Sequence, residues 1–459
     1  MSDLFASLNS AARALDAQRL GLDVVGQNIA NVNSPGYTRR ALDLSPIPPN
    51  TKFSAGGGVT VEDIHAQRDY LIERRLRTET SAERREAALA DALGIVELAL
   101  GKAGQSVDAD LSAFFDSFAT LAENPTSAVS RNEVQDQGQN LAASFRAISS
   151  GLTSARQDAD TQVGSVVEDI NNIVERLRTL NQTIASSPPE ARLAPQDAQA
   201  LLVRQLTELA DVSVLQRTDG GVDVSIGNGR PLVVGVTAYE VDATATGPSG
   251  YLQLSTEGFS LTGEITGGKL GALLEVRDAT IPGYLTQLDE LAYEVVQQVN
   301  DLHATGYDQS GTAGGDFFSF SASLTGSAGA AAAIRLDPAI VDDGSLIAAS
   351  GSTEVGGNTV ARAIAALRDA RVLSGGTATL SDAWGQLVYR VGRDVKNAQS
   401  EQSNRSEILN QVESLRDQVS GISLDEEAAQ MLRFQRAYEA NARFFRLIDE
   451  TLDMLFSMA

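Results

Sequence analysis

Residues 422–458 read ISLDEEAAQMLRFQRAYEANARFFRLIDETLDMLFSM, and this stretch decides the fold. Seam positions recur every seven residues in two columns: Leu424, Met431, Tyr438, Phe445 and Leu452 form one, and Glu427, Phe434, Asn441, Ile448 and Leu455 the other. Such spacing predicts a long helix with an apolar seam. Ser423, with Glu426 three residues later, is typical of a capping box. Because no Gly or Pro follows Gly421, the helix could extend about 50 Å.

The first thirty residues carry a matching seam. Its columns are Leu8, Leu15, Leu22 and Ile29, and Leu4, Ala11, Gln18, Val25 and Val32. We predict that the two chain ends pair as a coiled coil, with the polar Gln18 and Asn441 fixing its register. The alternative is a pair of ordinary core helices of a globular domain. Chain ends usually fray unless they are held, so their position favours a seam that other subunits complete.

Composition excludes several classes of protein. The net charge is −24 and only four lysines are present, which argues against nucleic-acid binding. Residues 1–40 carry +1 and residues 421–459 carry −3, so the middle of the chain holds −22. Cysteine is absent, which excludes disulfides and Cys-ligated metals. We find no membrane-spanning apolar run and no secretory signal peptide. The expectation is a cytoplasmic chain or one that leaves the cell without a cleaved signal.

The predicted fold class is mainly α with a smaller β portion. The residues Asn31, Asn33, Pro35, Gly36 and Tyr37 form a connector motif that ends the first helix. Further helices are expected at 63–100, 107–121, 131–150, 154–186, 196–210, 268–303, 359–370 and 380–419, and strands at 212–217, 222–226, 232–236 and 251–254.

These elements predict a discontinuous domain order. The predicted divisions are a terminal coiled-coil domain at 1–35 and 422–459, a connector at 36–62, a helical body at 63–319 and 359–421 with β-hairpins at about 212–262, and an outer insertion at 320–358.

Several motifs resemble those of bacterial flagellar axial proteins. The N-terminal NIANVNSPGYTR (28–39) and the C-terminal FQRAYEANAR (434–443) are similar to signatures shared by rod, hook and hook-associated proteins. The middle of the chain is similar to hook-associated proteins of the hook–filament junction. The stretches that carry this second resemblance are VDVSIGNGRPLV (222–233), GGKLGALLEVRD (267–278), DLHATGYD (301–308), GGDFFSF (314–320) and EEAAQMLRFQ (426–435).

The resemblance implies an extracellular structural protein that forms a ring between hook and filament. Its implied partners are copies of itself, hook protein, a second junction protein or flagellin, and an export chaperone. It also implies type III export without a cleaved signal. Family members often carry a larger outer domain where this chain has only residues 320–358, so that domain is expected to be reduced. Another axial protein, from hook or rod, is the alternative.

The sequence shows no catalytic constellation and predicts no cofactor or metal. Gly263 to Lys269 matches part of a phosphate loop, but Leu270 replaces the Ser or Thr that would hold magnesium. His65 and His303 are expected at solvated helix positions. Asp308 to Asp316 is expected to be a plain turn. Two further classes stay open: a nucleotide-dependent enzyme, and a membrane-active protein, which the Lys-free acidic C-terminal helix disfavours.

Overall fold

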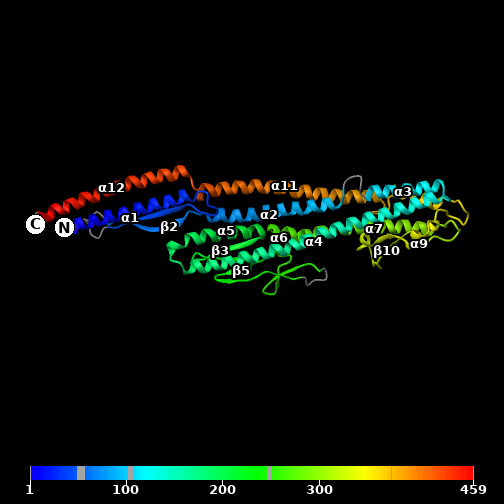
Figure 1. Cartoon of the computed structure of the whole chain (residues 1–459), viewed down its shortest axis with the longest axis horizontal. Coiled ribbons are helices and arrows are strands. Elements are labelled where there is room, and N and C mark those ends of the chain that lie inside the picture. Colours follow the sequence, from blue (N-terminus) through cyan, green and yellow to red (C-terminus); the bar gives the residue numbers. More distant parts are fainter. Residues whose placement is uncertain (1, 49–56, 102–106, 245–249, 374, 458–459) are drawn as a thin grey trace.

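The computed structural model describes residues 2–48, 57–101, 107–244, 250–373 and 375–457. The molecule is an elongated rod with both chain ends at the same end (Figure 1). It is 65% helical with 12% strand, which confirms the predicted mainly α class. The helices are α1 (Ser2–Ala30), α2 (Tyr70–Ala99), α3 (Val107–Glu123), α4 (Ala128–Ser186), α5 (Leu193–Leu209), α6 (Gly268–Glu275), α7 (Ile281–Ala304), α8 (Ala330–Ala333), α9 (Pro338–Asp342), α10 (Thr359–Ala366), α11 (Leu380–Ser420) and α12 (Leu424–Ser457).

The strands form four small antiparallel sheets. The sheet orders are β1-β2, β3-β4-β5-β6, β7-β8-β9 and β10-β11. Their bounds are β1 (Arg40–Ile47), β2 (Gly58–Ala66), β3 (Val212–Gln216), β4 (Val222–Ile226), β5 (Arg230–Val234), β6 (Thr237–Ala238), β7 (Asp242–Thr244), β8 (Gln253–Thr256), β9 (Phe259–Ser260), β10 (Phe318–Phe320) and β11 (Ile334–Leu336). The strands predicted from alternation within 212–254 are therefore confirmed as β3, β4, β5 and β8.

Two apolar cores hold the body together. One joins α4 and α5 to the inward side chains of β4 and β5. The other lies further from the chain ends and joins α2, α3, α4, α7, α10 and α11. At its centre the rings of Phe114, Phe118, Phe317 and Phe318 pack edge to face and tilted, with the Phe317 and Phe318 centroids 4.9 Å apart. Aromatic pairs in this geometry contribute beyond the apolar area they bury.

Residues 128–186 form one helix, whereas two were predicted. The predicted gap between 150 and 154 is absent, and burial continues through it: Ser149 is 4% exposed and Leu152 is fully buried. Gly151 is explained by packing, because a Cβ there would lie 3.1 Å from the Ala99 side chain at the end of α2. Continuous side-chain packing along α4 outweighs the weak local helix propensity.

The helix predicted from residue 63 begins at Tyr70. The Asp69 carboxylate caps it by accepting hydrogen bonds from the backbone N–H groups of Leu71 (2.8 Å) and Ile72 (3.2 Å). The preceding residues form β2, which pairs with β1 in a hairpin beside α1. Of the connector predicted at 36–62, residues 49–56 lie outside the described residues.

The predicted outer stretch, 320–358, packs directly on the helical body. Ile334 and Leu336 of β11 and Ile340 of α9 belong to the larger core, and the Asp289 carboxylate of α7 accepts the backbone N–H groups of Gly329 (2.8 Å) and Ala331 (2.9 Å). A short 3-10 turn, η3 (Gly344–Leu346), follows, and the buried Arg131 of α4 donates to the carbonyl oxygen of Ile347 at 2.6 Å. These contacts fasten the stretch to α4 and α7.

His303 was predicted to be solvated, and this prediction is wrong. Its side chain is fully buried near the end of α7. Nε2 accepts a hydrogen bond from the backbone N–H of Ala348 at 2.8 Å, so Nδ1 carries the proton and donates to the carbonyl oxygen of Gly315 at 2.7 Å. The neutral ring thus joins two segments that follow α7. Burial lowers the pKa of His303, against the opposing effects of the hydrogen bond to Gly315 and of nearby Asp316.

We expect acid to destabilise the fold through His303. Because its pKa is lowered in the folded state, the unfolded chain gains a proton first, and stability present above pH ~6.5 is lost as the pH falls below it. The limiting slope is about 1.4 kcal/mol per pH unit. Urea titrations between pH 7.5 and 5.5 measure it. The His303→Gln variant should be less stable at pH 7.5, and its unfolding free energy should depend less on pH. Equal pH slopes for the variant and the native chain would contradict the expectation.

Candidate site: the paired chain ends

The two chain ends lie side by side, as the sequence predicts (Figure 1). Helix α1 lies between α12 on one side and the β1-β2 hairpin on another. Gly21 allows the first contact, because a Cβ there would lie 2.5 Å from the Phe434 ring. Gly58, with a left-handed φ of 89°, allows the second, because its Cβ would lie 2.5 Å from the Ser10 hydroxyl. Two neighbours therefore cover α1.

The predicted seam residues of α12 are unevenly buried. Ile448 and Leu452 are 6% and 5% exposed, and Met431, Phe434 and Phe445 are half-buried. Leu424, Tyr438 and Leu455 are exposed. Ser423 accepts the backbone N–H of Glu426 at 3.4 Å, the first half of the expected capping box, while the Glu426 carboxylate instead pairs with Arg39 at 3.2 Å.

The predicted seam residues of α1 are mostly half-buried. Val25 is buried, whereas the half-buried members are Leu4, Leu8, Leu15, Leu22 and Ile29. The most buried side chains lie on a stripe of smaller residues that the sequence reasoning missed. They include Ala17 at 1% exposure, Val24 at 4% and Asn28 at 1%. Spacing of four and three residues, with Gly21 in the middle, was the available signal for this stripe.

Two contacts fix how α1 and α12 are aligned. Asn28 meets Glu427, and Gly21 meets Phe434. Seven residues separate the two contacts on each helix, in opposite directions, so the helices are antiparallel in one register. In this register Gln18 and Asn441 are not opposite each other. Both are half-buried, and among the described residues neither side chain has a hydrogen-bonding partner. Their register role stays a prediction.

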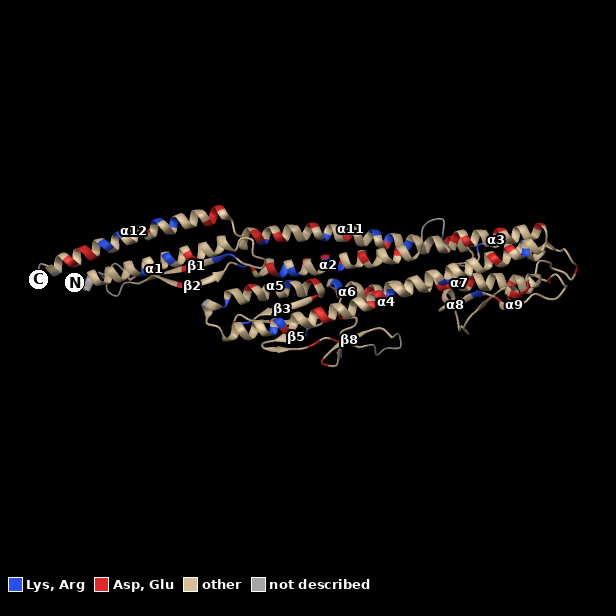
Figure 2. Ribbon diagram, viewed as in Figure 1, with Lys and Arg blue, Asp and Glu red and all other residues tan. Residues whose placement is uncertain are grey.

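A buried polar cluster closes the pair where it meets the body. We call it the elbow cluster, and its members are Asn28, Tyr37, Thr38, Arg39, Arg40, Arg68, Asp197 and Glu427. In Figure 2 the basic segment after α1 and the acidic start of α12 lie at the same end of the helix pair. Charges buried this deeply need partners with good geometry.

Asn28 uses its whole hydrogen-bonding capacity. Its amide NH2 donates to the Glu427 carboxylate and to the carbonyl oxygen of Arg40, both at 3.0 Å. Its amide oxygen accepts the backbone N–H of Arg40 at 3.0 Å and the Tyr37 hydroxyl at 3.1 Å. A side-chain amide has two donors and two lone pairs, so all four are satisfied. Burial raises the pKa of Tyr37, which keeps this donor protonated.

Glu427 is the charged partner of Asn28 on the C-terminal helix. It is 1% exposed, and its other carboxylate oxygen accepts the Nε of Arg39 at 2.7 Å. Arg39 is also tied to the end of α11, because its backbone N–H donates to the carbonyl oxygen of Ser420 at 3.2 Å. Charge-assisted bonds of this length are stronger than neutral ones. Three chain segments therefore meet at one carboxylate.

Asp197 of α5 is the anchor on the body. The Arg68 guanidinium donates to it at 2.5 Å, and Arg40 lies 3.7 Å away. Burial raises the pKa of Asp197, against the opposing effect of Arg68 and Arg40. The adjacent residues Arg39 and Arg40 thus bind opposite partners, one on the C-terminal helix and one on the body.

The connector motif forms the turn between these anchors. Asn31 accepts the Ser34 hydroxyl at 3.0 Å and donates to the carbonyl oxygen of Gln27 at 2.9 Å. Gly36 has a left-handed φ of 82°, and a Cβ there would lie 3.4 Å from the Leu201 side chain of α5. Asn33 and Pro35 are exposed. The motif therefore seats the turn against the body and delivers Tyr37 to Asn28.

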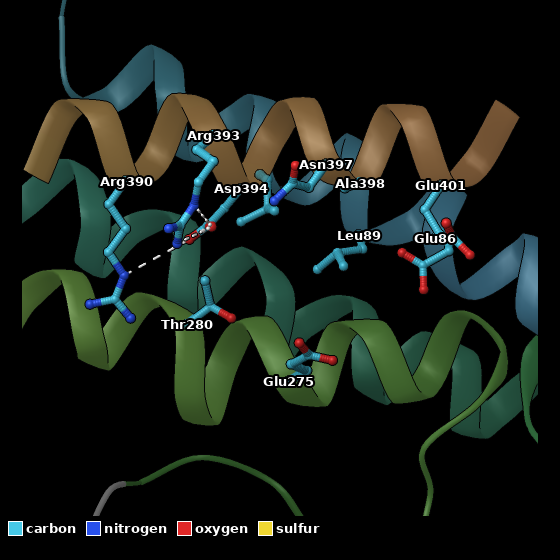
Figure 3. A pocket seen from close by; sticks show the side chains of 11 residues that line it. Glu86, Leu89, Glu275, Thr280, Arg390, Arg393, Asp394, Asn397, Ala398 and Glu401 are labelled. Atoms are coloured by element: carbon cyan, nitrogen blue, oxygen red, sulfur yellow. Dashed lines mark hydrogen bonds and ion pairs between the residues drawn. The ribbon is translucent and has the colours of Figure 1, made fainter. Parts of the chain in front are cut away.

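A cleft of about 420 Å³ lies between α2, α11 and the π-helical turn η2 (Val276–Thr280) (Figure 3). Its charges neutralise one another. Asp394 accepts the Tyr284 hydroxyl at 2.9 Å and pairs with Arg393 at 3.1 Å. Glu86 and Glu275 both pair with Arg85. In the described ranges, no group of His, Cys, Asp and Glu side chains could hold a metal ion. The cleft offers no ligand set.

The glycine-rich stretch before Lys269 is explained by packing. Gly268 has a left-handed φ of 66°, and a Cβ there would lie 2.5 Å from the backbone nitrogen of Ala210. Leu270 is fully buried in the core around α4 and α5. A two-residue antiparallel strand, β9, precedes the stretch. The glycines therefore allow close contact between α6 and the end of α5.

Known protein families match the chain in three places. The model described as "Flagellar hook-associated protein FlgK helical domain" matches residues 93–318, from α2 to β10. The models for the flagellar basal body rod FlgEFG protein C-terminal region and for the flagella basal body rod protein match residues 417–458 and 8–38. The last two cover the paired chain ends, including Asn28 and Glu427.

Whole proteins are similar over nearly the full length. Flagellar hook-associated protein 1 of Bacillus subtilis (strain 168) is 28% identical, with 100% of this chain and 99% of that protein aligned. The Escherichia coli (strain K12) protein of the same name is 22% identical, with 98% and 99% aligned. A solved structure of the flagellar hook junction protein FlgK from Burkholderia pseudomallei has the same fold, with a TM-score of 0.69 and 17% identity over 75% of this chain and 100% of that chain. Over nearly its full length the chain is therefore similar to flagellar hook-associated protein 1, FlgK.

Proposed function

We propose that this chain is a structural subunit of the bacterial flagellum that joins hook to filament, assembling with copies of itself through its paired end helices. One observation carries the self-assembly. The outer face of α12 exposes Phe444 (48%), Leu447 (59%) and Met454 (58%), while Ile448 and Leu452 pack inward. Contiguous exposed apolar side chains mark an interaction surface. Sister subunits would cover this face, as the repeated seam implies.

The partners and location follow the resemblance to axial proteins. We propose contacts with hook protein on one side, and with a second junction protein or flagellin on the other. An extracellular position in the flagellum requires export without a cleaved signal, with a chaperone covering the apolar face of α12 until assembly. The absence of cysteine supports passage of an unfolded chain, because no disulfide can cross-link it.

We also propose a terminal domain at 1–35 and 422–459, a connector at 36–62 and a body at 63–319 and 359–421. The stretch at 320–358 would be a reduced form of an outer domain. The E. coli relative supports this proposal, because the alignment spans 549 residues against 459 in this chain. The packing of β11 and α9 on the body leaves little of the stretch to form a separate core.

Other functions have less support. A hook or rod protein would share the end helices, since rod-family models match both ends, but the helical-domain match at 93–318 favours the junction protein. Among the described helices, none is long and apolar enough to cross a membrane. We propose no enzymatic activity: the glycine-rich stretch is packed against α5, and the body cleft is neutralised internally.

Deletion of the gene for this chain tests the proposal. Electron microscopy of the mutant cells should show hooks without filaments, with filament subunits lost to the medium. Expression of the intact chain in these cells should restore filaments. Normal filaments on the mutant cells would contradict the junction role.

A further inference from the structure

We infer that the buried contact of Asn28, Arg39 and Glu427 selects the register in which the C-terminal helix pairs with the N-terminal helix. This assigns a specificity role to three elbow-cluster residues, distinct from the apolar seam that drives pairing. The inference concerns how one chain brings its own ends together, so it goes beyond assembly between subunits.

The seam alone leaves the register open. Its apolar residues repeat every seven positions on both helices, so sliding α12 by seven residues again sets apolar columns against apolar columns. A seven-residue slip shifts the helices by about 10.5 Å and preserves the faces they present. Regular seams of this kind need a polar device that penalises the alternatives.

Glu427 supplies that device. Its side chain is 2% exposed, and its two oxygens are held by Asn28 at 3.0 Å and Arg39 at 2.7 Å. A slip of one heptad in either direction removes both donors at once and leaves the carboxylate without these partners. A buried carboxylate without partners is strongly disfavoured. The aligned state is the one that satisfies it.

Asn28 in turn requires Glu427 as a hydrogen-bond acceptor. All four of its hydrogen-bonding positions are used, and three of them join it to Arg40 and Tyr37 in the segment that follows α1. The amide is therefore held by its own segment independently of α12, and Glu427 is the α12 carboxylate that meets it. Gln18 and Asn441, whose register role stays a prediction, have no such partners among the described residues.

The absence of native cysteine makes the register measurable by cross-linking. In the purified full chain, the pair Gly21→Cys/Phe434→Cys reports the aligned register, because residue 21 lies against the Phe434 ring. The matched slipped reporter is Gly21→Cys/Asn441→Cys with Phe434→Ala, which also removes the ring but lies one heptad further along α12. A short bismaleimide joins the cysteines, and the intramolecular product is quantified by peptide mass spectrometry.

We expect the 434 product to exceed the 441 product by at least about tenfold in the otherwise native chain, since a slip leaves one buried charge unpaired. Adding Asn28→Leu and Glu427→Leu should bring the two yields within about threefold, because no buried carboxylate then distinguishes the two registers. The control Glu426→Leu, at an exposed neighbour that also pairs with Arg39, should keep the preference. Asp197→Asn should keep it too, since Asp197 binds the body side.

Two results would overturn the inference. One is a strong preference for the 434 product that persists in the Asn28→Leu/Glu427→Leu chain. The other is a native chain that gives equal yields or no 434 product. If circular dichroism shows that the double variant loses helix, Glu427→Gln replaces it, because it keeps the side-chain volume and removes the charge. Its preference must then fall at least about threefold, since the charge-assisted bond from Arg39 is lost.

Discussion

Replacing Phe444 and Leu447 together by glutamate is expected to abolish filament assembly while leaving the fold of the chain intact. Both side chains lie on the outer face of α12, at 48% and 59% exposure, away from the face that packs on α1. In the monomer the glutamates would be solvated. In a ring they would lie where a sister subunit is expected, and covering them would bury charge without a partner.

The expected effect is large because the lost apolar contact and the added charge both weaken association between subunits. Each apolar side chain that a neighbour covers contributes roughly 1–2 kcal/mol, and this contribution is lost. The carboxylates then oppose association, in a helix that already carries a net charge of −3 over 421–459. Since the same contact repeats at every subunit of a ring, the losses add around it. Cells expressing the variant should show bare hooks.

Electron microscopy of cells and circular dichroism of the purified variant test both halves of this expectation. The matched control is Leu71→Glu/Leu98→Glu, which places two glutamates at the more exposed apolar positions of α2, 77% and 81% exposed. That control should assemble filaments. Normal filaments with the α12 variant would place the assembly contacts elsewhere, and a loss of helix in its monomer would mean that these side chains stabilise the chain itself.

The pairing of the chain ends could be predicted because a seven-residue repeat is a local property of the sequence. The register could not, because its determinant joins residues 399 positions apart. Glu427 was visible as the charged exception in an apolar column, and Asn28 begins the NIANVNSPGYTR motif. Nothing local indicates that the two meet. From the sequence, the polar seam residues Gln18 and Asn441 were equally good candidates for fixing the register. The structure leaves both half-buried and without a hydrogen-bonding partner within its described part.

The wrong predictions for the helical body have a similar origin. The helix predicted to end at 150 continues through Gly151, whose close approach to Ala99 is a tertiary contact that local helix propensity does not indicate. His303 looked solvated because its partners are backbone groups of Gly315 and Ala348, which carry no side-chain signature. Strand alternation at 212–226 was predictable because one face of β4 packs on a core, so that buried residues alternate with less buried ones along the strand.

Replacing Arg277 by methionine is expected to destabilise the body by about 3–5 kcal/mol, the cost of leaving a buried ion partner alone. Arg277 is fully buried between the two apolar cores. It donates to Asp160 of α4 at 2.7 Å and to the carbonyl oxygen of Leu252 at 2.8 Å. Its other nitrogens hold Asp278 through two bonds, at 2.8 and 2.7 Å. One guanidinium therefore joins α4, the π-helical turn and the loop before β8.

The methionine variant removes the cation but keeps the apolar stem, so the effect should come from Asp160, which is 5% exposed. Of its hydrogen-bonding partners in the described residues, its carboxylate would keep the backbone N–H of Leu252, at 3.0 Å. The double variant Asp160→Leu/Arg277→Met removes the stranded charge and should therefore be more stable than Arg277→Met alone. Urea titration, monitored by far-ultraviolet circular dichroism, gives the order of stability of the native chain and the two variants. If Arg277→Met alone unfolds at the native midpoint, or if the double variant is the less stable of the two, the buried ion pair does not brace the two cores, and their own apolar contacts hold them together.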